Sequence, residues 1–160
     1  MPARQSGLTL PELLTTLAVV AIMAAIAVPA YQSMVQTNAQ AAAHNALVSS
    51  LNLARSEAQR RRQVVYVTPI GGQWQTGWEV WVDADSDGTF DSGTDTLVRR
   101  YTSSGPAVTV SGPSGIGFGP DGSLIQASAT RLQLRTPNAH EGVDITLTRS
   151  GQFVRTTVHP

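Results

Sequence analysis

The feature that most limits the possible folds of this chain is an apolar run that begins directly after Glu12. From Leu13 to Ala30 the sequence has 18 residues without a charge, and almost all of them are Leu, Val, Ile, Ala or Met. A run of about this length suits a helix that crosses a bilayer. No cation follows Glu12 before Arg55. A lone carboxylate in hydrocarbon is costly, so it is normally neutralised, paired or functional.

The same residues also fit a secretory signal peptide. Arg4 would belong to its basic region, and Ala25-Ile26-Ala27 would form a small-x-small cleavage site, which leaves Val28 as the first mature residue. Two observations speak against this interpretation. Glu12 interrupts the approach to the apolar core, and amphipathic helical sequence continues beyond the cleavage site without a break. We therefore favour one continuous helix.

The stretch Gly7-Leu8-Thr9-Leu10-x-Glu12, followed by a long apolar helix, resembles the class III leader of type IV pilins and type II secretion pseudopilins. In that family a prepilin peptidase cuts after the Gly on the cytoplasmic side and methylates the new amino group. The resemblance implies cleavage between Gly7 and Leu8, which makes Glu12 the fifth mature residue. Leu8 stands where the family usually has Phe. Pro11 stands where Ile or Val is common, and Pro is acceptable in the first turn of a helix.

We expect three segments: a leader at residues 1–7, a long helix at residues 8–62 and a β-rich head at residues 63–160. Pro29 lies inside the helix, where it removes one hydrogen bond and kinks the axis, and the resemblance places a Pro there in pilins generally. The first part of the helix is expected to span the membrane. In the second part, spacings of 4, 3 and 4 predict one buried stripe, formed by Leu47, Leu51, Ala54 and Ala58.

After residue 62 the apolar pattern changes to the period of 2 that is typical of strands. The predicted class is therefore α+β, with a long N-terminal helix packed on a small, mostly antiparallel β head. Pro120-Asp121-Gly122 predicts a turn. Strands are predicted at residues 64–68, 78–82, 96–101, 107–111, 116–118, 131–136, 143–149 and 152–158.

The head also resembles a particular group of pilin-like proteins. A tryptophan-bearing strand, an acidic loop, a Phe-Gly-Pro-Asp-Gly stretch and a terminal hairpin together resemble the FimT/GspH group of minor pilins and pseudopilins. The strand with Trp78 and Trp81, followed by the acidic loop, points more to FimT than to GspH.

The loop Asp83-Ala84-Asp85-Ser86-Asp87-Gly88 matches the first half of a calcium-binding loop, with oxygens at alternate positions and Gly at the turn. Thr94 stands where such a loop places a bidentate Glu, and flanking helices are missing from the pattern. Asp91 and Asp95 could complete a looser site. The alternative is a solvated acidic turn, because Asp and Gly favour turns. We favour the turn and expect no metal or other cofactor.

The terminal hairpin raises the question of DNA binding. FimT-type proteins implicated in DNA uptake carry a Gly-Arg-x-Arg motif here, whereas this chain reads Gly151-Gln152-Phe153-Val154, with Arg155 one place late. A two-residue turn at Ser150-Gly151 would pair Leu147 with Val154 and point Phe153 and Arg155 outward. A weak phosphate-binding patch would then consist of Arg131, Arg135, Arg149, Phe153 and Arg155. The alternative, which we favour, is a few exposed arginines on a neutral domain.

Composition narrows the remaining functions. The chain has no Cys, and its formal net charge is zero, so neither thiol chemistry nor a global positive field is available. No catalytic arrangement is found, because His44, His140 and His159 are scattered and no nucleophile motif occurs. We expect a protein that is not an enzyme.

The resemblance implies a minor pilin that takes part in type IV pilus assembly. The alternatives are a type II secretion pseudopilin of the GspH type and a minor pilin that binds DNA during natural transformation. The implied partners are other pilins or pseudopilins, the prepilin peptidase and the bacterial inner membrane. Weak, non-specific binding of DNA is a further alternative. The implied location is a single pass through that membrane with the head in the periplasm, and then a pilus or pseudopilus.

Overall fold

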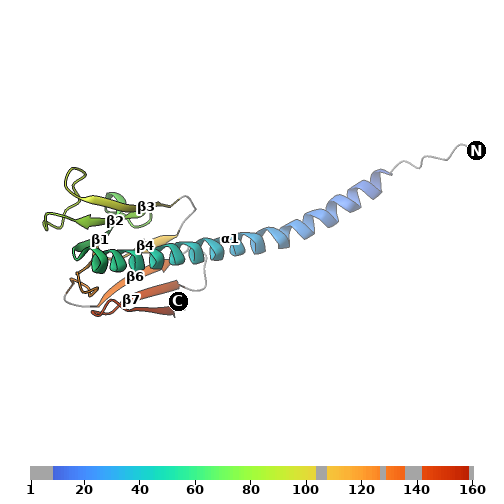
Figure 1. Cartoon of the computed structure of the whole chain (residues 1–160). Coiled ribbons are helices and arrows are strands. Elements are labelled where there is room, and N and C mark those ends of the chain that lie inside the picture. The colour runs from blue at the N-terminus through green and yellow to red at the C-terminus, as the bar shows by residue number, and fades with distance from the viewer. Residues whose placement is uncertain (1–8, 104–107, 127–128, 136–141, 159–160) are drawn as a thin grey trace, which may run out of the picture. The chain divides into compact units, whose positions relative to one another are not determined.

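The structure, a computed structural model, describes residues 9–103, 108–126, 129–135 and 142–158. The chain divides into two compact units, Met1–Val35 (the N-terminal unit) and Gln36–Pro160 (the head unit). One long helix is followed by short antiparallel strands (Figure 1). The predicted α+β class is confirmed.

Helix α1 spans Leu10–Arg61 and is continuous through Pro29. Arg60 and Arg61 lie in its last turn, where cations suit the negative end of the helix dipole. The next residue, Arg62, has a φ of 57°, the left-handed conformation that commonly ends a helix. The predicted C-terminal end is therefore correct to one residue.

The part of α1 in the head unit buries one face. Leu47, Leu51, Ala54 and Ala58 are each fully buried, which confirms the predicted stripe. Burying a leucine side chain contributes about 1.5–3 kcal/mol, so this stripe holds the helix on the sheets. Ser50 lies on the same side, and its hydroxyl accepts a hydrogen bond of 2.9 Å from the indole of buried Trp78.

The strands form two four-stranded antiparallel sheets. The first has the order β3-β2-β1-β5 and the second the order β4-β6-β7-β8. A short 3-10 helix, η1 at Ile70–Gly72, separates β1 from β2. The strands are β1 Val64–Pro69, β2 Gly77–Asp83, β3 Thr96–Thr102, β4 Thr109–Ser111, β5 Ile116–Phe118, β6 Thr130–Arg135, β7 Gly142–Leu147 and β8 Phe153–Val158.

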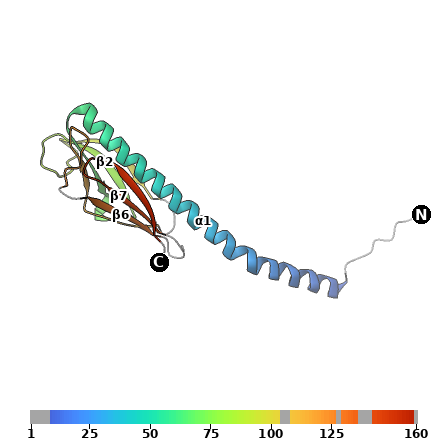
Figure 2. The same ribbon diagram turned by 90° about the horizontal axis from the view of Figure 1, so that it is seen from below.

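Both sheets and the second part of α1 share one hydrophobic core. Figure 2 shows β2, β6 and β7 along the green part of α1. The large, fully buried side chains come from the helix and from both sheets, for example Leu51, Phe118 and Leu132. The head unit is therefore a single packed body in which α1 covers strands of both sheets.

Each predicted strand is present among the described residues, with ends that differ by one or two positions; residues 107 and 136 lie outside the described part. The predicted turn at residues 120–122 is also found, with Gly122 at a φ of 78°.

The predicted pairing of the terminal hairpin is wrong by one residue. Leu147 pairs with Phe153, not with Val154. A two-residue hairpin turn requires a positive φ at its first residue, here Ser150, and this position is usually occupied by Gly. Of Ser150 and Gly151, however, Gly151 alone has a positive φ, of 74°. The chain instead forms a three-residue loop closed by Thr148, whose N–H donates to the Gln152 carbonyl at 2.9 Å.

This slip turns every side chain of β8 to the other face of the sheet. Phe153 packs against the core, whereas Val154 is 50% exposed. Arg155 pairs with Ile145, a core residue, and therefore lies on the helix side of the sheet. The predicted outward position of Phe153 is wrong for the same reason.

Candidate functional site

Glu12 lies in the first turn of α1 and closes a cap on the helix. The backbone N–H of Thr9 and its hydroxyl both donate to Oε2 of Glu12, at 3.4 and 3.3 Å. Such a carboxylate complements the positive end of the helix dipole. Its side chain is exposed. The predicted cleavage residues, Gly7 and Leu8, lie outside the described part of the chain.

The segment that follows Glu12 carries apolar side chains that are not packed into the hydrophobic core described above. An 18-residue window in α1 has a mean hydropathy of 2.4, and none of it is buried. By length and composition, this part of α1 is apolar enough to cross a membrane. Large side chains at least half exposed include Leu10, Leu13, Leu14, Leu17, Val19, Val20, Ile22, Met23, Ile26 and Val28.

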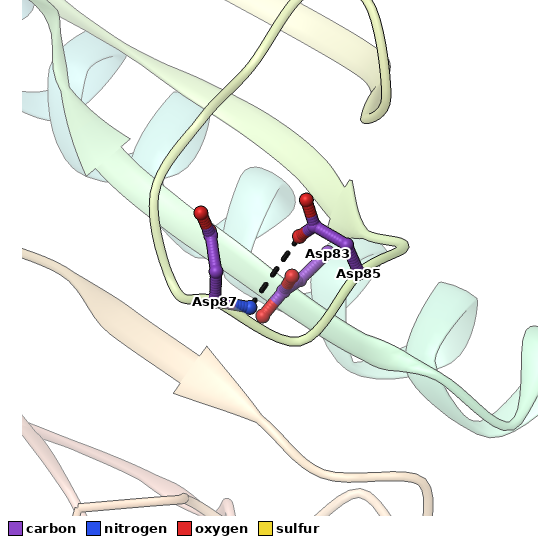
Figure 3. A group of neighbouring side chains, drawn as sticks. All are labelled: Asp83, Asp85 and Asp87. Carbon is purple, nitrogen blue, oxygen red and sulfur yellow. Dashed lines mark hydrogen bonds between the residues drawn. The ribbon is translucent and has the colours of Figure 1, made fainter.

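The acidic loop after β2 brings three carboxylates together. One oxygen each from Asp83, Asp85 and Asp87 lies within 4.8 Å of the others (Figure 3). Asp91 is not part of this group. Calcium takes six to eight oxygen ligands, so these three carboxylates would have to be joined by other oxygens. A calcium site at this loop stays the less favoured alternative to a solvated turn.

Asp83 stabilises the turn through hydrogen bonds to the backbone. Its two carboxylate oxygens accept hydrogen bonds from the N–H groups of Ser86, at 2.8 Å, and Gly88, at 3.2 Å. Burial raises the pKa of this carboxyl, while the two amide hydrogen bonds oppose the rise. The alternating Asp pattern is thus explained in part by backbone hydrogen bonding, as in other Asp-rich turns.

Three aromatic side chains pack beside this loop. Trp81 stacks on Tyr66 with ring centroids 4.9 Å apart, and Phe90 of the loop lies 5.5 Å from Trp81. Burial raises the pKa of the Tyr66 phenol, and the charges of Asp83 and Asp87 raise it further. Sequence reasoning did not predict this cluster. The alternation in β1 and β2 could have shown that Tyr66 and Trp81 share the face opposite the valines.

Asp95 also organises the loop. Its carboxylate accepts hydrogen bonds from the N–H groups of Ala84, at 3.0 Å, and Asp91, at 2.8 Å. The sequence suggested Asp95 as a possible metal ligand. Its observed hydrogen bonds show a structural role, because they join the two ends of the loop.

The arginines of β6 lie next to a buried carboxylate. Nη1 of Arg135 is 2.8 Å from Oδ1 of Asp144, and Nη1 of Arg131 is 3.8 Å from Oδ2 of the same residue. Asp144 is only 4% exposed. The carboxylate of Asp144 therefore balances part of the positive charge of Arg131 and Arg135. This weakens the attraction of the two arginines for phosphate.

The remaining residues of the predicted DNA-binding patch do not share one face of the sheet with this pair. Arg131 pairs with Thr146, on the face opposite to Ile145 and Arg155. Phe153 packs inward, and Arg149 lies in the exposed turn. The structure thus divides the five residues between two faces and a turn, and DNA binding by them stays the less favoured alternative.

Comparison with known protein families matches residues 43–151 to the model described as Type II transport protein GspH. This match covers more than half of the chain. The chain belongs to the GspH family. Residues 2–28 match the prokaryotic N-terminal methylation motif. The predicted membership of the FimT/GspH group of type IV pilin-like proteins is confirmed, whereas the preference for FimT over GspH stays a prediction.

The two matches cover different parts of the candidate sites. The methylation motif includes Gly7, Leu8 and Glu12. The GspH match includes the acidic loop and ends at Gly151, before Phe153 and Arg155. Gly7, Leu8 and Glu12 therefore lie within a recognised motif, whereas β8 lies beyond the matched part of the head.

Two crystal structures of the type IV minor pilin FimU from Pseudomonas aeruginosa strain PAO1 are similar to this GspH-family chain. One has 17% sequence identity and a TM-score of 0.62, and the match covers 77% of this chain and 92% of FimU. The other crystal form has 18% identity, a TM-score of 0.57 and coverages of 72% and 90%. At this identity the likeness shows the fold. A search of curated proteins found none that matches.

Proposed function

We propose that this protein is a minor pilin that takes part in assembling a type IV pilus. The observation that carries the proposal is the exposed apolar segment of α1, which follows Glu12 and in which none of the 18-residue apolar window is buried against the described residues. Exposed apolar surface of this extent is unfavourable in water. It requires a bilayer before assembly and neighbouring helices afterwards.

The first step is processing at the membrane. Prepilin peptidase removes residues 1–7 between Gly7 and Leu8 and methylates the amino group of Leu8. The match of residues 2–28 to the methylation motif supports this step. Before processing, the first part of the helix predicted at residues 8–62 anchors the chain in the inner membrane, and the head lies in the periplasm.

In the second step Glu12 selects the position of the subunit in the filament. The new amino terminus of a neighbouring subunit is a cation, and Glu12 is the carboxylate at the start of an otherwise uncharged helix segment. In the apolar interior of a filament, an unpaired carboxylate is strongly unfavourable. Pairing Glu12 with that amine removes the penalty, so assembly in the correct register is favoured. The hydrogen bond from Thr9 to Glu12 then belongs to the free subunit, before Glu12 pairs with that amine.

Analysis of the N-terminus of the native protein tests the proposal. We expect mass spectrometry of the membrane or filament fraction to show N-methylated Leu8 as the first residue. Val28 as the first residue would identify a cleaved signal peptide and rule out the pilin-type anchor.

A second candidate is a pseudopilin of a type II secretion system, and the family description, Type II transport protein, favours it. Processing and the role of Glu12 are the same in this case. Deletion of the gene distinguishes the two. Loss of twitching motility with normal protein export supports the pilus, and loss of exported enzymes with normal motility supports the secretion system.

A further inference from the structure

The face of the second sheet that lies opposite the buried Leu132 carries two arginines around one carboxylate. Arg131 and Arg135 of β6 flank Asp144 of β7, with Nη1 of the two guanidinium groups 3.8 and 2.8 Å from its oxygens. Asp144 is 4% exposed, while the side chains of Arg131 and Arg135 are 63% and 40% exposed. One carboxylate does not balance two guanidinium groups, so this face keeps an excess of positive charge.

The two arginines are engaged to different degrees. Nη1 of Arg135 also donates to the backbone carbonyls of Leu134, at 3.0 Å, and Val143, at 3.4 Å. Arg131 makes its 3.8 Å contact with Asp144 and no hydrogen bond within the described part of the chain. A guanidinium group has five N–H donors. Arg131 therefore keeps donors for a second carboxylate.

Arg131 also lines an open hollow in this face. The hollow has a volume of about 310 Å³, and its other lining residues are Ser111, Gly112 and Gln133. Ser111 of the edge strand β4 pairs with Gln133 of β6, so their side chains lie on the same face as Arg131. The hollow thus presents a guanidinium, an amide and a hydroxyl group. Each of these can donate a hydrogen bond to a carboxylate oxygen.

The opposite charge is concentrated in the acidic loop between β2 and β3, at residues 83–95. This loop contains five Asp and no Lys, Arg or His. The side chains of Asp85, Asp87 and Asp91 are exposed. Among the described residues, no ion pair joins a carboxylate of the loop to an arginine. The loop therefore offers carboxylates that a cationic surface of another molecule can bind.

We propose that the acidic loop of one copy of this chain docks its exposed carboxylates on the Arg131 hollow of a second copy. The loop belongs to the first sheet and the hollow to the second, so each copy offers two different, complementary surfaces. Such a heterologous contact continues from copy to copy and does not close a dimer. It holds neighbouring heads in the filament proposed above, and in this respect it rests on the proposed function.

Disulfide trapping tests the contact, because the chain has no Cys of its own. Two full-length variants, Ser92→Cys in the loop and Ser111→Cys at the hollow, are purified in detergent micelles with EDTA, mixed and oxidised. Both positions are exposed. We expect the mixed disulfide to dominate over the two disulfides between identical variants, as measured by peptide mass spectrometry. Random proportions overturn the proposal, and so does the absence of the mixed disulfide, which is the result if the hollow binds a different pilin.

Charge changes assign the contact to Arg131. Arg131→Glu on the Ser111→Cys copy should lower the mixed disulfide by about two- to fivefold. Asp91→Arg on the Ser92→Cys copy should do the same, and the loop should keep its shape, because its described hydrogen bonds use the backbone of Asp91 and not its carboxylate. Yields are corrected for the reactivity of each thiol toward iodoacetamide. The two changes together should raise the yield above that of either one, and failure to do so contradicts the proposal.

Two further variants separate the local contact from general effects of charge and folding. Arg149→Glu makes the same charge change at an exposed arginine outside the hollow, and it should leave the yield unchanged. A loss as large as that of Arg131→Glu would show a general charge effect and overturn the proposal. Arg131→Gln removes the cation without placing a new carboxylate beside Asp144. It should also lower the yield, and an unchanged yield rules out a role for Arg131.

The result is separable from that of the proposed function. Trapping in micelles needs no filament, and analysis of the N-terminus does not involve the head. Methylated Leu8 without a mixed disulfide keeps the pilin assignment and removes the contact. A mixed disulfide with Val28 as the first residue keeps the contact between heads and removes the pilin assignment.

Discussion

Residues 10–35 of α1 expose their large apolar side chains, whereas the part from residue 36 onward buries its own. Leu17 is 57% exposed and Leu51 is fully buried, although both are leucines in one uninterrupted helix. The difference lies in the pattern around them. The first part is apolar on all sides, and the second has one apolar stripe among polar residues. A helix with one apolar stripe needs a partner surface on that side only. A helix that is apolar on all sides needs an apolar environment all around it.

The largest expected effect concerns the one charge in the first part. Glu12→Ala should abolish incorporation into the filament, because the amine of the neighbouring subunit loses its partner, while the head stays folded. Immunoblots of sheared filaments and of membranes measure the two pools. Thr16→Ala, an exposed neutral site in the same segment, should incorporate normally. Normal incorporation of the Glu12→Ala variant would remove this carboxylate from the mechanism.

The next prediction compares the two leucines directly. Leu51→Ala should lower the free energy of unfolding of the head by about 2–5 kcal/mol, because it leaves a cavity between α1 and the sheets. Leu17→Ala should change it by less than about 0.5 kcal/mol. Denaturant unfolding followed by tryptophan fluorescence reports on the head, since the three tryptophans, at 74, 78 and 81, lie there. A similar loss in both variants would show that the two parts of α1 stabilise the head alike.

The smallest predicted effect compares two hydroxyl groups. Ser50→Ala should destabilise the head by about 1–3 kcal/mol, because the buried indole N–H of Trp78 loses its acceptor. The Thr16 hydroxyl donates to the carbonyl of Leu13 in its own helix at 2.8 Å, so Thr16→Ala should leave the stability of the head unchanged. The same unfolding measurement applies, and an unaffected Ser50→Ala variant would mean that another group accepts from Trp78.

Much of the fold could be predicted because its elements follow local patterns. The helix stripe has period 3.6 and the strands have period 2, and both are visible in the residues themselves. The leader motif likewise depends on residue types at fixed offsets. The sequence analysis did not predict that Glu12 accepts hydrogen bonds from Thr9, although Thr-x-x-Glu at the start of an apolar helix is a recognised capping pattern.

The candidate binding surfaces were predicted less well, because they depend on contacts between distant segments. The Asp-rich loop suggested a metal site by composition. Its geometry depends also on Asp95, at the far end of the loop, and on the aromatic cluster that packs beside it. Likewise, the balance of Arg135 by Asp144 follows from the pairing of β6 with β7.

The sequence by itself determined a continuous helix with an apolar first part, a carboxylate at its start and a β head, because each of these follows from residue types at local spacing. The tertiary structure decided the side on which each residue of β8 lies. Phe153-Val154-Arg155 has an apolar residue available for either register, so the pattern alone does not choose. The left-handed Gly151 and the packing of Phe153 on the core select one register, and that choice places Arg155 on the same face of the sheet as Ile145.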